Sequence, residues 1–296
     1  MRLVDDFDTV PPFEVLAPAE QRAPLVFNSP HSGRCYPKSF VDASQLAADA
    51  IRRSEDVLVD DLFKAAPENG AILMRANFPR AFLDVNREPY ELDPKMFDGR
   101  LPDYVNARSI RVAGGLGTIA RLVSETQEIY RGRLSVEEGL GRIESLYMPY
   151  HKALRRLLAH SHVNFGYAVL IDCHSMPSTV RGSYGKMRPD IILGDRYGAS
   201  CSPELTRTVI SILSDLGYAV SRNKPYAGGF ISEHYGRPVK GLHALQIEIN
   251  RALYMDEKTY EPHEGFERIA GDMTRLIGEL AALPGADFWP DQAAAE

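Results

Sequence analysis

Short apolar runs that end in polar residues recur along the chain. Such runs predict buried β-strands, here at 24–28, 70–74, 167–173, 190–195 and 243–250. Residues 82–87 alternate between apolar and polar side chains, which predicts a further, half-buried strand. Between the strands, apolar residues at helical spacing predict helical structure at 43–66, 135–158, 203–216 and 258–282. Within the first of these, Ser54-Glu55-Asp56 lies in a helix or at a break between two helices.

This alternation of strands and helices predicts one α/β domain over residues 1–296, with peripheral tails at 1–20 and 284–296. The stretch from 88 to 117 is rich in Pro, Gly and Asp, and we expect a long loop there. Ser135 with Glu138 three residues later predicts a capping box at the start of a helix.

The strand at 167–173 leads into Cys173-His174-Ser175. Ligands of open α/β sheets bind beyond the carboxyl ends of the strands, so His174 is a candidate metal ligand or catalytic base. The alternative is that Asp172 and His174 only hydrogen-bond the loops around the strand end. Cys173 adjoins His174, but neighbours on a strand face opposite sides, so we expect a buried core thiol rather than a cysteine nucleophile.

Composition excludes several classes of partner. Hydrophobic residues make up 44% and charged residues 25% of the 296 positions, as in ordinary globular proteins. With a formal net charge of −6 and no polybasic run, neither nucleic acid nor membrane is an expected partner. Three cysteines and an acidic N-terminus without the apolar core of a signal peptide predict a cytoplasmic protein.

Polar groups follow several predicted strands: His31, Asn86 with Arg87, His174 and Glu248. Two histidines and a carboxylate are a standard zinc set that leaves the fourth position for water, whose pKa zinc lowers to about 7. A second carboxylate can act as general base, and arginine suits an oxyanion or a substrate carboxylate. The chain has no His-Glu-x-x-His motif, so spacing alone does not specify the site.

Five motifs, in this order, resemble those of the N-formylglutamate amidohydrolase (deformylase) family: Asn28-Ser29-Pro30-His31-Ser32-Gly33-Arg34, Ser54-Glu55-Asp56, Asp84-Val85-Asn86-Arg87, Asp172-Cys173-His174-Ser175 and Gln246-Ile247-Glu248-Ile249-Asn250-Arg251. The resemblance extends from about residue 24 to 275. It implies a zinc-carboxypeptidase-like (phosphorylase/hydrolase-like) fold, with a mixed, mostly parallel sheet flanked by helices on both faces. It also implies one bound Zn²⁺ ion, or another divalent metal.

By this resemblance His31 and His174 match the two zinc histidines. The carboxylate ligand falls on Asp56 or on Glu55, and we favour Asp56. Carboxypeptidase-like enzymes place that acid three residues after the first histidine, where this chain has Arg34.

The resemblance also assigns catalytic and substrate-binding residues. Glu248 matches the general base, and Arg80 is the candidate for polarising the scissile carbonyl. Asn86 with Arg87 match the pair that binds a substrate carboxylate, and Arg251 is the candidate for a second carboxylate. The roles of the arginines could be exchanged.

The implied reaction is zinc-dependent hydrolysis of N-formyl-L-glutamate to formate and L-glutamate, the last step of one route of histidine degradation. As partners we expect a small acidic N-acyl amino acid and, at most, a second copy of the chain, so that the protein is a monomer or homodimer. Two alternatives stay open: a metallo-amidohydrolase for another N-acyl acidic amino acid, and a non-catalytic metal-binding or ligand-binding relative. At the level of single residues, His31 could cap a turn, Asp56 could be a surface acid, and Glu248 could form a structural ion pair with Arg251 or Arg87.

Overall fold

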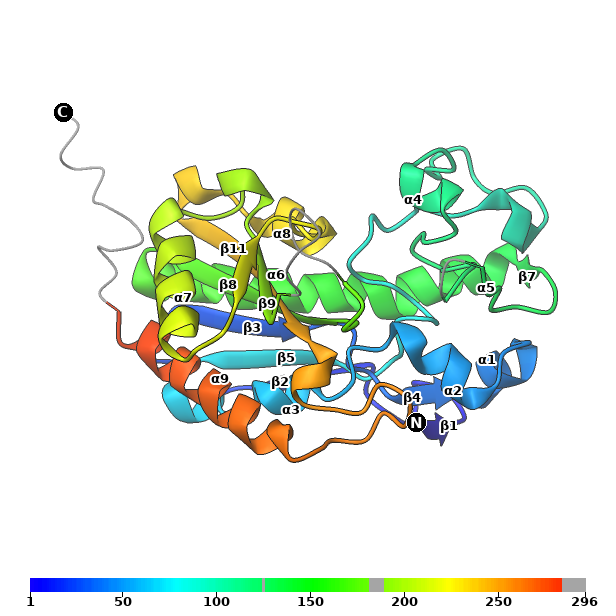
Figure 1. Ribbon diagram of the computed structural model, residues 1–296. Coiled ribbons are helices and arrows are strands. Elements are labelled where there is room, and N and C mark those ends of the chain that lie inside the picture. Colours follow the sequence, from blue (N-terminus) through cyan, green and yellow to red (C-terminus); the bar gives the residue numbers. More distant parts are fainter. Residues whose placement is uncertain (124–125, 181–188, 284–296) are drawn as a thin grey trace. The chain divides into compact units, whose positions relative to one another are not determined.

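The computed structural model describes residues 1–123, 126–180 and 189–283 (Figure 1). The chain divides into two compact units. The first comprises Met1–Glu14, Pro30–Val57 and Arg75–Leu154, and the second comprises Val15–Ser29, Leu58–Met74 and the chain from Arg155 onward. The predicted tail at 284–296 lies outside the described residues, and the single domain stays a prediction.

A mixed sheet runs through the second unit. Within the described residues it has seven strands, in the spatial order β10 (Val220–Arg222), β9 (Ile191–Gly194), β11 (Leu242–Asn250), β8 (Ala168–Met176), β3 (Leu25–Ser29), β5 (Ile72–Ala76) and β2 (Phe13–Leu16). The pairs β3–β8, β8–β11 and β9–β10 are parallel, whereas β9 and β11 are antiparallel. The predicted mixed, mostly parallel α/β sheet is confirmed.

The central strands are buried along their whole length. Every residue of β3 and of β8 is buried, which explains why the sequence shows continuous apolar runs there rather than alternation. The polar residues inside these runs are therefore exceptions that need buried partners. Asn28 and Asp172 lie opposite each other in the β3–β8 pair and hydrogen-bond through their side chains.

Short loops and helices complete the second unit. Helix α7 (Pro203–Asp215) begins as predicted, because the Ser202 hydroxyl accepts the Leu205 N–H and Pro203 occupies the first turn. Helix α9 (Gly265–Ala281) contacts α7 and α3 (Val59–Leu62), and α8 (Phe230–Tyr235) contacts β11 and β8. Figure 1 shows α7 and α9 next to each other.

The predicted start of α9 at 258 is wrong. The Asp256 carboxylate accepts the N–H groups of Lys258 and Thr259, which closes a turn instead of opening the helix. Tyr260 follows with a left-handed φ of 61°, a conformation that a helix interior does not allow.

The first unit consists of short elements joined by long loops. Strands β1 (Arg2–Val4) and β4 (Cys35–Pro37) form one small parallel pair, and β6 (Phe97–Asp98) and β7 (Leu134–Ser135) form another. Its helices are α1 (Lys38–Ala43), α2 (Ala48–Ile51), α4 (Ile110–Ala113) and α5 (Val136–Arg142), the last continuing through a π-helical turn into α6 (Met148–Phe165). Ser135 accepts the Glu138 N–H and caps α5 as expected.

The structure decides one open expectation and differs from two others. Residues 43–66 form no single helix: of the two open possibilities the break at Ser54-Glu55-Asp56 is observed, where Glu55 is extended and Leu58 is left-handed. Residues 82–87 form no strand; the Asp84 carboxylate accepts the Asn86 N–H and closes a turn. Residues 1–20, expected as a tail, include β1 and the sheet strand β2.

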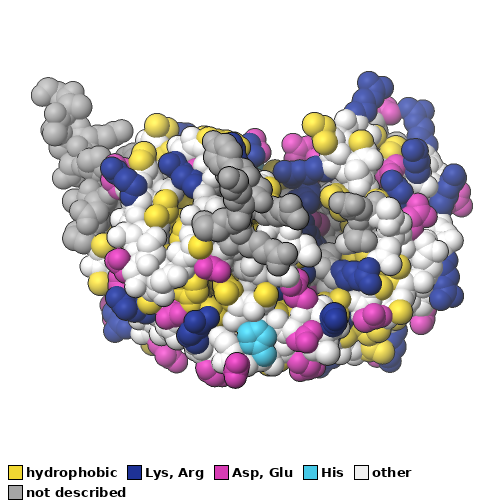
Figure 2. Space-filling view, in the orientation of Figure 1, with side chains coloured by type: hydrophobic (Ala, Val, Ile, Leu, Met, Phe, Trp, Pro, Cys, Tyr) yellow, Lys and Arg dark blue, Asp and Glu magenta, His cyan; other side chains and the backbone are white. Residues whose placement is uncertain are grey.

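Surface charge is mixed. Figure 2 shows acidic and basic side chains interspersed on the face in view, in keeping with the similar numbers of Lys and Arg (34) and of Asp and Glu (40). Among the described residues, none of the helices has the length and apolar character needed to cross a membrane.

Candidate metal and catalytic site

The turn that follows β3 places His31. The strand ends at Ser29, and His31 lies two residues further along the chain. The backbone carbonyl of His31 accepts the N–H of Asp56 at 3.0 Å, in the segment where the predicted helix is interrupted. This interruption brings the Asp56 carboxylate to 3.4 Å from Nδ1 of His31, and both side chains are buried.

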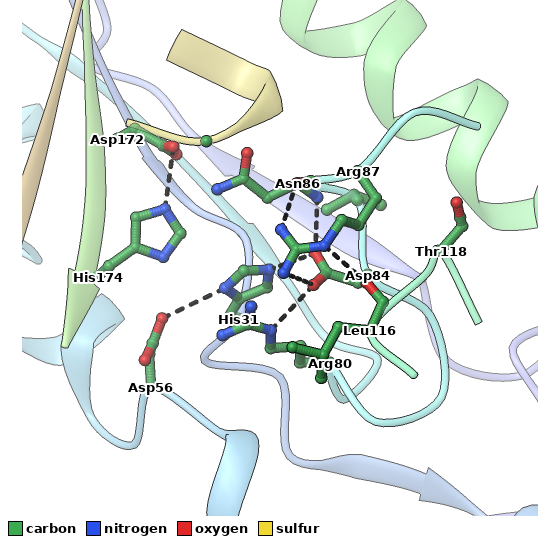
Figure 3. A network of polar contacts seen from close by, with 12 residues as sticks. His31, Asp56, Arg80, Asp84, Asn86, Arg87, Leu116, Thr118, Asp172 and His174 are labelled. Carbon is green, nitrogen blue, oxygen red and sulfur yellow. Dashed lines mark hydrogen bonds and ion pairs between the residues drawn. The ribbon is translucent and has the colours of Figure 1, made fainter. Parts of the chain in front are cut away.

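Asp84 holds the other side of the His31 ring. Its Oδ1 lies 2.8 Å from Nε2 of His31, while Oδ2 lies 3.0 Å from Arg80 and 3.6 Å from Arg87 (Figure 3). Burial alone would raise the pKa of Asp84, but Arg87, Arg80 and His31 lower it well below its ordinary value. Asp84 is therefore an anion that accepts a hydrogen bond from Nε2 of His31.

His174 is held in the same way, but from its own strand. It lies on β8, and its Nε2 is 2.9 Å from Oδ2 of Asp172, two residues earlier on the same face (Figure 3). Asn28 donates to Oδ1 of Asp172 at 2.8 Å, which fixes that carboxylate. With Nε2 donating to a carboxylate in both histidines, Nδ1 is the nitrogen whose lone pair would bind a metal.

Three buried side chains could together hold a metal ion. Within the described residues, one ligand atom each from His31, Asp56 and His174 lie within 4.8 Å of one another. Two imidazoles and a carboxylate are a donor set that zinc binds in hydrolases, and histidine–carboxylate hydrogen bonds behind the ligands are typical of such sites. The residues present therefore fit a zinc ion.

Glu55, the alternative carboxylate, has other partners. It accepts a hydrogen bond from the Tyr36 hydroxyl, and its Oε2 lies 3.1 Å from Nε of Arg52. Burial raises the pKa of Glu55, although Tyr36 and Arg52 oppose that effect. The neighbouring Asp56 is the acid that faces His31.

Glu248 lies beside His174 in the sheet. The two residues are register partners in the parallel β8–β11 pair, where adjacent strands are about 4.8 Å apart, so their side chains leave the same face. Gln246, two residues earlier, donates from Nε2 to Oε1 of Glu248 at 2.8 Å. Arg251 follows β11 directly and donates to the Ser175 hydroxyl at 3.0 Å.

The remaining candidates gather around Asp84. Arg87 donates from Nε to the carbonyl of Leu116 and from Nη1 to the carbonyl of Asn86 (Figure 3). Burial lowers the pKa of Arg87 to about 10, so the side chain stays charged at neutral pH. Arg80, Asn86 and Arg87 thus form one cluster, and their roles toward a substrate stay predictions.

Cys173 does not have the properties of a nucleophile. Burial, followed by the charge of Asp172, raises the pKa of the thiol well above its ordinary value. The thiolate is the reactive form of cysteine, so this environment favours the expected core thiol.

Sequence reasoning missed three supporting side chains. The sequence predicts for Asp172 only hydrogen bonds to loops at the strand end, and it assigns no role to Asp84 or Gln246 beyond their place in the family motifs. Two of them carry a signal in the sequence: Asp172-x-His174 and Gln246-x-Glu248 have the two-residue spacing that places side chains on one face of a strand. Asp84 has no such signal, because it reaches His31 from a turn.

Comparisons with known proteins agree with the five motifs. Residues 23–255 match the family model of N-formylglutamate amidohydrolase. The chain is 32% identical over 249 residues to an N-formylglutamate deformylase of Pseudomonas aeruginosa, covering 83% of this chain and 87% of the relative. It is 30% identical over 270 residues to an N-formylglutamate deformylase of Pseudomonas putida, covering 90% and 94%.

A solved structure is also similar. The crystal structure of N-formylglutamate amidohydrolase from Ralstonia eutropha JMP134 superposes with a TM-score of 0.86 at 36% identity, covering 92% of this chain and 98% of the other. Sequence and fold thus agree over most of the chain. The protein belongs to the N-formylglutamate amidohydrolase family.

Proposed function

We propose that this protein hydrolyses the formamide bond of N-formyl-L-glutamate, giving formate and L-glutamate, with a zinc ion held by His31, Asp56 and His174. The observation that carries the proposal is the register of β8 and β11, which sets Glu248 beside His174. A carboxylate next to a metal-ligand set is what a metallohydrolase needs as general base. The printed names of the two Pseudomonas relatives support the same substrate.

The bound zinc ion would supply a Lewis acid and lower the pKa of bound water to about 7. Glu248 takes one proton from the attacking water, whose oxygen forms a new bond to the formyl carbon. Glu248 then returns that proton to the glutamate nitrogen as the C–N bond breaks. Water is consumed, and the products are formate and the free amine.

The arginines suit an acidic substrate. N-formylglutamate carries two carboxylates, and Asn86 with Arg87 would bind one of them while Arg251 binds the other. Arg80, at the edge of the Asp84 cluster, would polarise the formyl carbonyl and stabilise the oxyanion. The buried Asp84 keeps Arg80 and Arg87 in place, so the substrate meets prearranged charges. In this role the protein would act in the cytoplasm, in the last step of a histidine degradation route.

The direct test is release of formate from N-formyl-L-glutamate by chelator-treated protein before and after addition of zinc. We expect little release without metal and full release once about one zinc ion per chain is restored. N-acetyl-L-glutamate and N-formyl-L-leucine serve as controls for the acyl group and the second carboxylate. Formate release that is indifferent to chelator and zinc contradicts the metal assignment, and turnover of N-acetyl-L-glutamate alone contradicts the substrate.

A further inference from the structure

A row of buried polar side chains crosses the central strands two residues before the site residues His174 and Glu248. Asn28 on β3, Asp172 on β8 and Gln246 on β11 are consecutive register partners. The next row on the same face contains His174 and Glu248. Asp172 holds His174, and Gln246 holds Glu248, each across a two-residue step along its own strand. The two strands therefore support their site residues in the same way.

The orientation of the Gln246 amide is fixed by a second contact. The backbone N–H of Gly229 donates to Oε1 of Gln246 at 2.9 Å. An N–H can only donate, so the oxygen of the amide faces Gly229 and the nitrogen faces Glu248. Gln246 is only 5% exposed. Reversing its amide would bring the amide NH₂ group against the Gly229 N–H and the amide oxygen against an oxygen of Glu248, so neither hydrogen bond would form.

The loop that carries Gly229 is itself anchored to the sheet. The N–H of Arg196 donates to the carbonyl of Ala227 at 2.7 Å. A Cβ atom at Gly194, the last residue of β9, would lie 2.6 Å from the Gly228 nitrogen, so only glycine allows this approach. Gly229 is the N-cap residue of α8, which packs on β11. The donor that orients Gln246 is thus a backbone group in a fixed place.

We propose that Gln246 is a positioning residue: bridged between the Gly229 amide and Glu248, it holds the Glu248 carboxylate in the orientation needed for proton transfer. The inference rests on the proposed function, in which Glu248 is the general base. A neutral amide suits this task because it donates one hydrogen bond to the carboxylate without supplying a proton or a charge. Removal of Gln246 should leave substrate binding intact and slow the chemical step.

The test replaces Gln246 by methionine, which has a similar length and forms neither hydrogen bond. In zinc-loaded Gln246→Met we expect kcat for formate release to fall by about 10- to 100-fold, the range seen when partners behind site residues are removed. KM should stay within about threefold and zinc content at the wild-type value, because the variant changes no residue proposed to bind either.

The matched control is Gln21→Met. Gln21 is a partly buried glutamine of the same unit that hydrogen-bonds Ala23 and Ser161 through its side chain. We expect it to lower stability without lowering kcat. A Gln246→Met protein that folds, binds zinc and keeps the wild-type kcat overturns the proposal, as does an equal loss of kcat in Gln21→Met.

Crystal structures provide a readout that does not depend on activity. We expect Glu248 to change rotamer or lose order in Gln246→Met and to be unchanged in Gln21→Met. If the zinc-loaded wild type releases no formate, the proposed function fails, and the position of Glu248 in these structures still decides the role of Gln246. If Gln246→Met does not fold, a zinc-loaded wild-type structure in which Gln246 and Glu248 are not in contact overturns the proposal.

Discussion

His243 should make the protein less stable as the pH falls from 8 to 5. The side chain lies on β11 and is only 2% exposed, and its Nδ1 accepts the N–H of Ser202, the residue that caps α7. Burial lowers the pKa of His243 from 6.5 to about 4, with a small opposing effect of Glu204. Between about pH 4 and pH 6.5 the unfolded chain is therefore protonated at His243 while the folded chain is not.

The sign and size of the effect follow from this difference. Above pH 6.5 His243 is neutral in both the folded and the unfolded chain, and the free energy of unfolding is at its full value. As the pH falls from 6.5 toward 4, the unfolded chain is protonated at His243 while the folded chain is not, so the free energy of unfolding decreases. With these two pKa values, the loss between pH 8 and pH 5 amounts to about 2 kcal/mol in the free energy of unfolding.

The assay is urea unfolding of metal-free protein at pH 8 and pH 5, for wild type and His243→Asn. Asparagine does not titrate, and its Oδ1 can accept the Ser202 N–H from nearly the position of Nδ1. We expect the decrease in stability between the two pH values to be about 2 kcal/mol smaller in this variant. The exposed His160→Asn is the control and should leave the decrease unchanged. The same decrease in wild type and His243→Asn, or an NMR titration of His243 near 6.5, would refute the reasoning.

Three further predictions concern the proposed zinc site, the loop after β9 and the core. Asp84→Asn removes the anion behind His31 and should weaken zinc binding by about 10- to 100-fold in a chelator competition; an unchanged Kd contradicts the role of Asp84. Burial would raise the pKa of Asp195, but hydrogen bonds from Arg222, Asn223 and Thr206 lower it below 3.8. Asp195→Asn should therefore cost about 1–3 kcal/mol of unfolding free energy at pH 7, a difference that shrinks as the pH falls through the folded pKa; an unchanged urea midpoint at pH 7 would contradict this. The fully buried Leu170→Ala should cost about 2–5 kcal/mol by urea unfolding, and the 81% exposed Val163→Ala should cost almost nothing; equal losses would contradict the assigned burial.

Patterns confined to one strand or one helix could be predicted from the sequence. The apolar runs placed β3, β8 and β11, and Ser202-Pro203 placed the start of α7. The predicted end of β8 at residue 173 is too early, because the polar pair His174-Ser175 is typical of residues beyond a strand. Both residues lie inside it, and their burial is possible because each has a hydrogen-bond partner.

Contacts between distant parts of the chain could not be predicted. The sequence leaves open whether residues 43–66 are broken at Ser54-Glu55-Asp56, because the break depends on the bond from Asp56 to the backbone of His31, a contact that local propensity does not encode. Asp84 likewise sits in a turn that its own carboxylate forms, although the alternating pattern of 82–87 favours a strand. The resemblance to the family had singled out both Asp56 and the Asp84 motif, but the part that Asp84 plays behind His31 emerges only from the structure.

The most direct test of the central claim is one variant measured in two ways. Glu248→Gln keeps the size of the side chain and removes the base, so zinc content should stay at the wild-type value of about one ion per chain. Release of formate from N-formyl-L-glutamate should fall by about 100- to 10,000-fold, the contribution of a general base. A zinc-loaded Glu248→Gln protein that turns over at the wild-type rate would contradict the account, because proton transfer would then not involve Glu248.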